Sequence, residues 1–197
     1  MRRTIPMLLL GCWWAMTASA EPAEPPKPSA LEAWKTSAAT GASHERLGLL
    51  TGSWKVEAQY LAQAGSPPAA GVATIEALLG GRTIEERLST QLFGQSYEVL
   101  YLLGYDNTRK KYWGIWIDNL TSAATVAEGE LRPADGALVL EGSYDDPASG
   151  TRHTSRSELI VESESAFTLT LFDLGADGSA RPSLRLRHTR LPVKEAH

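Results

Sequence analysis

The clearest pattern along the chain is an alternation of apolar and polar residues that begins at residue 54. Trp54, Val56, Ala58 and Tyr60 share one parity, and polar residues lie between them. A period of two is typical of a strand with one buried face. Further β-like runs follow at 71–79, 82–92, 97–105, 112–117, 123–131, 137–144, 153–161, 166–171 and 184–189.

About ten short, evenly spaced strands are typical of an all-β barrel or sandwich. The breaks between the later runs hold Gly, Pro, Asp and Ser, as in residues 132–136, 145–150 and 175–179. The chain has no βαβ spacing and no internal repeat. We therefore expect a single antiparallel barrel, because a closed sheet leaves no edge strands and can enclose a pocket.

Residues 97–121 form the most aromatic part of the chain after residue 20, and a polar turn at 106–111 indicates a hairpin. Both parities of 112–117 are apolar, with Tyr112 and Trp116 on one face and Trp113 on the other. A barrel interior buries only one face. The other needs a cover, either the predicted helix at 43–50 with its leucines or a partner subunit.

The first 20 residues have the pattern of a secretory signal peptide. A basic start is followed by an apolar run at 5–16 and the cleavage motif Ala18-Ser19-Ala20. The apolar run is too short to span a bilayer. Two alternatives are a lipoprotein leader with its anchor at Cys12 and a twin-arginine signal at Arg2-Arg3. The expected location is the periplasm or the extracellular space.

The domain plan that follows is a leader at 1–20, a Pro/Ala-rich spacer at 21–42, a barrel domain at 43–191 and a tail at 192–197. Residues 31–36 also have the composition of a short helix. Cys12 is the only cysteine, so a chain cleaved after Ala20 has no disulfide and no thiol chemistry. The net charge is −4, and loss of Arg2 and Arg3 makes it −6. A mildly acidic surface argues against nucleic acid as a partner.

Gly52-Ser53-Trp54 opens the first strand and is similar to the G-x-W start of lipocalin-like (calycin) barrels. In those barrels a basic residue of the last strand stacks on the tryptophan, and Arg190 is the matching residue here. A longer resemblance covers residues 44–190. Its specific part is Gly104-Tyr105-Asp106-Asn107 followed by Trp116-Ile117-Asp118-Asn119, an order that resembles the bacterial family called domain of unknown function 1579. The resemblance implies the fold and a bacterial secreted setting, and it implies no activity.

His188 shares its parity with Leu184 and Leu186. An inward histidine could ligate haem, as in the nitrobindin-like barrels that this strand pattern resembles. The alternative is a histidine near the barrel mouth with a hydrogen-bonded partner. We expect no cofactor, with haem on His188 as the less favoured option.

Arg82, Glu85 and Glu86 stand on one predicted strand, where a buried Glu beside an Arg could orient a polar head-group. The alternative is a charged outer face. Asp106, Asn107, Asp118 and Asn119 have the composition of turn residues. No metal-ligand or nucleophile motif is present in the sequence.

The sequence favours a binding protein for a small apolar or amphipathic molecule over an enzyme. The predicted ligand-binding residues are Trp54, Tyr60, Arg82, Glu85, Tyr97, Tyr101, Trp116 and His188. Two other classes stay open. One is a barrel enzyme that uses Arg82, Glu85 or Asp118 for acid–base chemistry. The other is an interaction module that forms a homodimer.

Overall fold

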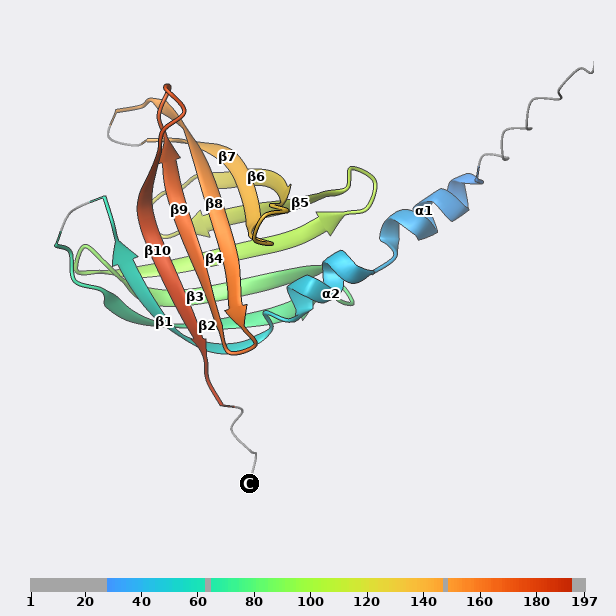
Figure 1. Ribbon diagram of the computed structural model, residues 1–197, viewed down its shortest axis with the longest axis horizontal. Helices are drawn as coiled ribbons and strands as arrows, with labels where there is room; N and C mark the ends of the chain where they lie inside the picture. The colour runs from blue at the N-terminus through green and yellow to red at the C-terminus, as the bar shows by residue number, and fades with distance from the viewer. Residues whose placement is uncertain (1–27, 63–64, 147–148, 193–197) are drawn as a thin grey trace, which may run out of the picture.

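A computed structural model describes residues 28–62, 65–146 and 149–192. It contains two short helices and ten strands, shown in Figure 1. The elements are α1 (Ala30–Ala38), α2 (Ala42–Gly48), β1 (Gly52–Tyr60), β2 (Ala69–Leu78), β3 (Thr83–Leu92), β4 (Gln95–Asp106), β5 (Lys111–Asp118), β6 (Ala124–Leu131), β7 (Leu138–Asp145), β8 (Arg152–Ser163), β9 (Ala166–Leu174) and β10 (Ala180–Arg190). The predicted all-β class is confirmed.

The sheet is a closed barrel in which every strand pairs antiparallel with the next strand of the chain. β1 and β10 complete the ring, with Trp54 opposite Arg190 and Tyr60 opposite Leu184. Closure leaves no strand of the sheet with an unpaired edge, which removes the usual route to edge-to-edge association.

The alternation read from the sequence corresponds to the two faces of the wall. Trp54, Val56 and Ala58 of β1 are buried inside, and the residues between them are exposed. On β5 the inward residues are Tyr112, Gly114 and Trp116. Trp113 lies on the outer face over Gly104, its partner on β4, where a Cβ would collide with the indole. The Trp113 ring thus packs on the bare backbone of Gly104, and this contact covers part of the outer apolar face of β5.

The helix α2 closes one end of the barrel, which corrects the expectation that it covers the outer face of β5. Leu47 and Leu50 point into the barrel and join the same core as Trp54 and Phe167. They are 2% and 4% exposed. The outer face of β5 therefore receives no cover from these leucines.

Trp54 and Arg190 complete this closed end. The Trp54 indole donates from Nε1 to the Leu50 carbonyl at 2.9 Å. The Arg190 guanidinium lies 4.1 Å from the centre of the Trp54 ring, so the stacking expected from the resemblance is confirmed. The same guanidinium donates to the carbonyls of Leu49, Thr51 and Glu164. Arg190 thus binds the segment after α2 to the last strands.

The helix α1 lies within the predicted spacer and extends away from the end of the barrel (Figure 1). Ser29 and Glu32 form a capping box at its start. At its other end the Asn107 side chain donates to the carbonyls of Ser37 and Ala39. Asn107, expected only to shape its own turn, thus attaches the helix to the β4–β5 turn.

Candidate functional site

A cavity of about 310 Å³ lies in the half of the barrel opposite α2. Its wall comes from β1 and from the consecutive strands β4 to β10. Much of that wall consists of small residues, such as Gly114, Ala127, Ser155 and Ser157. These leave space that larger side chains fill in the closed half.

Aromatic side chains from several strands give the cavity its apolar surface. Tyr97 and Tyr101 of β4 and Trp116 of β5 line it, and the Tyr101 and Trp116 ring centres are 5.4 Å apart. Tyr60 lies at the rim, edge-on to Phe93 of the β3–β4 turn at 4.7 Å. The hairpin that dominates the sequence thus supplies the main aromatic wall.

Asp118 ends β5 and lies beside this wall. Its Oδ2 accepts a hydrogen bond from Trp116 Nε1 at 3.1 Å and one from the Tyr97 hydroxyl at 3.3 Å. Its Oδ1 accepts from the backbone N–H groups of Leu120 and Thr121. Burial, followed by the negative charge of Asp118, raises the pKa of Tyr97. Asp118 therefore both shapes the turn and fixes two aromatic side chains.

Asp173 supplies a second carboxylate from β9, with Tyr144 of β7 as its donor at 3.0 Å. Burial and the Asp173 charge together raise the pKa of Tyr144 to about 12. Tyr144 also stacks on His153 of β8, with ring centres 5.6 Å apart. The predicted strand at 166–171 ended before Asp173, whereas β9 continues to Leu174. Tyr144 was the last residue of its predicted strand, so neither was identified as a site residue.

Below the cavity lies a buried pair, His188 and Glu86. His188 Nε2 is 2.7 Å from Glu86 Oε1, and both side chains are almost wholly buried. The imidazole stacks on Phe167 at 4.0 Å and meets Trp54 edge-on. Its Nδ1 has no hydrogen-bond partner among the described residues. Burial, with a contribution from the Glu86 charge, raises the pKa of Tyr101.

The surroundings of His188 do not fit haem. Its Nε2 faces Glu86, aromatic rings pack against the imidazole, and the residue does not line the cavity. The geometry agrees with the alternative in giving His188 a hydrogen-bonded partner, but it places the residue deep in the core and not near the barrel mouth. Glu86 shares its parity with Ile84 and Leu88, but the sequence does not show which face of this strand is inward, and it gives no sign of the partner on β10.

The structure separates the predicted ligand-binding residues into three groups. Tyr60, Tyr97, Tyr101 and Trp116 line the cavity. Trp54 and His188 are core residues of the closed half.

Arg82 and Glu85 lie outside the barrel. Arg82 is exposed and donates to the carbonyls of Ala38 and Leu79. Glu85 faces outward and pairs with Arg87. The parity of β3 therefore separates Glu85 from the inward Glu86, and the set Arg82, Glu85 and Asp118 is not assembled at one place.

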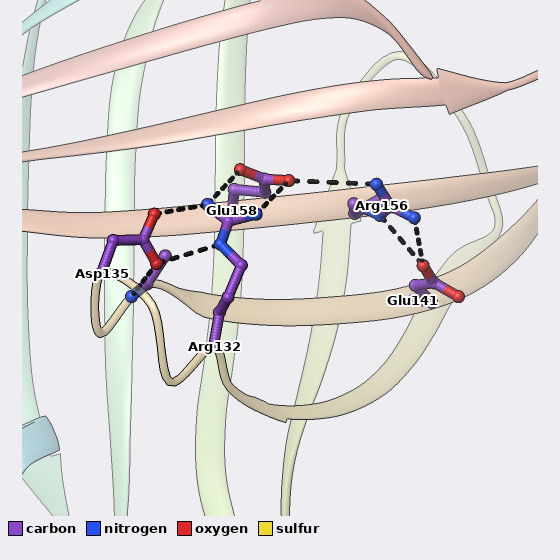
Figure 2. Close-up of polar contacts among 6 residues, drawn as sticks. Arg132, Asp135, Glu141, Arg156 and Glu158 are labelled. Atoms are coloured by element: carbon purple, nitrogen blue, oxygen red, sulfur yellow. Dashed lines mark hydrogen bonds and ion pairs between the residues drawn. The ribbon is translucent and has the colours of Figure 1, made fainter. Parts of the chain in front are cut away.

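A network of ion pairs covers the outside of β7 and β8 (Figure 2). Arg132 donates to both Asp135 and Glu158, and Arg156 donates to Glu141 at 2.7–2.9 Å. The pKa of Asp135 is lowered to about 2, mainly by its hydrogen bonds from the Arg132 guanidinium. The network orders the β6–β7 turn, which is joined to α2 because Arg46 donates to the Gly136 carbonyl at 2.8 Å.

Two absences hold for the described ranges 28–62, 65–146 and 149–192. No group of three or more His, Cys, Asp or Glu side chains there could hold a metal ion. None of the helices there has the length and apolar character needed to cross a membrane.

A family model for proteins of unknown function, DUF1579, matches residues 39–190. The chain therefore belongs to this family, as its G-Y-D-N and W-I-D-N segments suggested. A search of curated protein sequences finds no match. Among solved structures, the S-type phycobiliprotein lyase CPES from Guillardia theta is similar, with a TM-score of 0.50 and 11% identity. The match covers 81% of this chain and 98% of that one, and it supports the calycin-type barrel fold.

Proposed function

We propose that this protein binds a small apolar or amphipathic molecule in the cavity at the open half of its barrel. The observation that carries the proposal is the 310 Å³ cavity, walled by Tyr97, Tyr101 and Trp116 and edged by a few polar groups. Mostly apolar walls with a few placed polar side chains are the usual make-up of small-molecule sites. The volume is at the small end of such sites, so the ligand is compact.

The proposed setting is the periplasm or the extracellular space, and it rests on the leader pattern of residues 1–20. These residues lie outside the part that the structure describes. Fractionation of cells that express the full chain, with mass measurement of the product, tests it. Mature protein that begins at Glu21 supports secretion. A lipid on Cys12 would replace cleavage after Ala20 with an anchored, exported form, whereas an uncleaved cytoplasmic chain contradicts the proposed setting.

A pair of variants on β6 tests the binding site. Thr125 faces the cavity, whereas its neighbour Val126 lies on the outer wall and is 56% exposed. Thr125→Trp fills the cavity, and Val126→Trp adds the same side chain outside it. We expect the neutral probe N-phenyl-1-naphthylamine to gain fluorescence with the unmodified protein and with Val126→Trp, and not with Thr125→Trp. Equal responses from both variants would place the probe elsewhere.

A homodimer is a second candidate, and the outer face of β5 and β6 favours it. Ile117 and Val126 on that face are 40% and 56% exposed. Light scattering over a wide concentration range tests the dimer. A dimer that dissociates in Val126→Glu supports it, and a monomer at every concentration rejects it.

A further inference from the structure

The charged residues of the cavity wall are unevenly distributed. Among the described residues that line it, three are acidic (Asp118, Asp145 and Asp173) and one is basic, Arg156. The sign of the charge that a ligand meets depends on which of these four are already paired with protein groups.

Arg156 is already paired on the outside of the wall. Its guanidinium points to Glu141 and Glu158 (Figure 2). A ligand anion would have to compete with two carboxylates for it. Arg156 therefore gives the cavity little positive charge.

Asp145 is neutralised in a similar way, by Arg152 at 3.4 Å. Arg152 also donates to Ser143 Oγ at 2.6 Å, so it is held at the strand ends by two partners. Arg181 lies opposite Asp173 in the strand register, but it is exposed and forms no ion pair with Asp173 within 4.0 Å. His153 is engaged in its stack with Tyr144.

Asp118 and Asp173 therefore remain, and neither has an ion-pair partner within 4.0 Å in the described part of the chain. They differ in how much hydrogen-bonding capacity is left. Asp118 already accepts four hydrogen bonds, so it acts mainly through its charge. Among the described residues, Asp173 accepts a side-chain hydrogen bond only from Tyr144, and it has lone pairs free for another donor.

We infer that the cavity selects amphipathic molecules with a cationic amine head-group, and this inference rests on the proposed binding function. The ammonium N–H groups donate to Asp173, the charge of Asp118 adds to the attraction, and the apolar body packs on Tyr101 and Trp116. Charge-assisted hydrogen bonds are stronger than neutral ones. Faces of Tyr and Trp also attract cations, so the aromatic wall and the carboxylates favour the same ligand charge.

Three probes with one apolar body test the inference: 2-naphthylmethylamine, 2-naphthylmethanol and 2-naphthoate, titrated by calorimetry at low and high salt. We expect the amine to bind about tenfold tighter than the alcohol, and 2-naphthoate to bind weakest. The advantage of the amine should shrink at high salt, because salt screens charge attraction at a partly open site.

Asp173→Asn keeps an oxygen for the Tyr144 hydroxyl but loses the charge, so it should remove most of the amine's advantage over the alcohol. Asp118→Asn should reduce the advantage less, and a thermal melt checks its turn. Glu76→Gln is the matched control, because Glu76 is exposed on β2 and does not line the cavity. It should change nothing.

The outcomes separate the inference from the proposed function. Equal binding of all three probes, or loss of the preference in Glu76→Gln as in Asp173→Asn, overturns amine selection and leaves a binding protein. Failure of all three probes to bind, together with no response to N-phenyl-1-naphthylamine, overturns the proposed function itself.

Discussion

The two halves of the barrel interior are built from the same ten strands and differ in what fills them. The half next to α2 holds Trp54, Phe167, Leu186 and His188, all almost inaccessible to solvent. The other half has Gly114, Ala127, Ser155 and Ser157 at corresponding inward positions and contains the cavity. A Cβ at Gly114 would collide with the Tyr101 hydroxyl.

This difference shows how a barrel can separate stability from binding. Close packing in one half supplies most of the buried apolar contact, since side chains interdigitate there without voids. The open half gives up part of that packing and gains a site. Substitutions in the closed half should therefore act mainly on unfolding, and substitutions in the open half mainly on ligand affinity.

Replacement of a tryptophan by alanine in each half should give the largest change in the free energy of unfolding. Trp54→Ala removes a buried ring, its hydrogen bond to Leu50 and its contact with Arg190. It should lower the free energy of unfolding by about 4 kcal/mol. Trp116→Ala should cost less than half of that, because one side of Trp116 already faces the cavity. Urea unfolding measures both, and equal losses would remove the distinction between the halves.

Substitutions in the buried His188–Glu86 pair of the closed half should give the next largest change in stability. His188→Phe leaves the Glu86 carboxyl buried without its partner, at a cost of about 3 kcal/mol. The double variant Glu86→Leu/His188→Phe should regain most of that loss, since no polar group is then left unpaired. A double variant as unstable as the single one would show that the pair contributes by more than mutual satisfaction. Probe binding in the cavity should survive in the double variant.

Substitution of Arg190, at the same end of the barrel, should cause a smaller loss of stability. Arg190→Met keeps much of the packing on Trp54 and loses the cation contact and the hydrogen bonds to three carbonyls. The expected loss is about 2 kcal/mol, because part of the guanidinium is accessible to water. Arg190→Lys should recover only part of it, since an ammonium cannot reach all three carbonyls. Full recovery by lysine would indicate that charge alone matters.

The ease of prediction from sequence also differs between the halves. Alternation at 54–60, together with β-like runs and the turn residues between them, located all ten strands, and G-x-W with Arg190 identified the closing contact. The aromatic wall was found because Tyr97, Tyr101 and Trp116 lie on one hairpin. Asp173 and Tyr144 were missed because their hydrogen bond spans β8, which lies between β7 and β9 in the sheet, and the sequence does not show this contact between non-adjacent strands.

Strand bounds and parity explain why Arg82 and Glu85 do not reach the cavity. Arg82 precedes β3 and lies in the turn before it, although its parity is that of Glu86. Glu85 is within β3, but successive strand residues face opposite sides, so Glu86 turns inward and Glu85 outward. The sequence contains no marker of which parity is inward on a strand with charges on both faces. The partner of Glu86 is His188, which is 102 residues away.

The smallest expected change is in how stability depends on pH. One titrating group lies at each end of the barrel, so the two ends can be compared. At the α2 end, Arg132 lowers the pKa of Asp135 from 3.8 to about 2. A carboxyl whose pKa is lowered on folding stabilises the protein above its unfolded pKa, and this contribution is lost as pH falls from about 4 to about 2. At the cavity end the pKa of Tyr144 rises from 10.0 to about 12. Its contribution is complete below pH 10 and is lost as pH rises toward 12.

Single substitutions should reduce each arm of the pH profile separately. Asp135→Asn should make the acid arm shallower and leave the alkaline arm unchanged. Tyr144→Phe should make the alkaline arm shallower. Urea midpoints measured from pH 2 to pH 12 provide the comparison. The acid effect should be small and should weaken in salt, because Asp135 is exposed and water screens its pair with Arg132. If Asp135→Asn changed the alkaline arm, the two ends of the barrel would be electrostatically coupled, and their separation into a stabilising half and a binding half would fail.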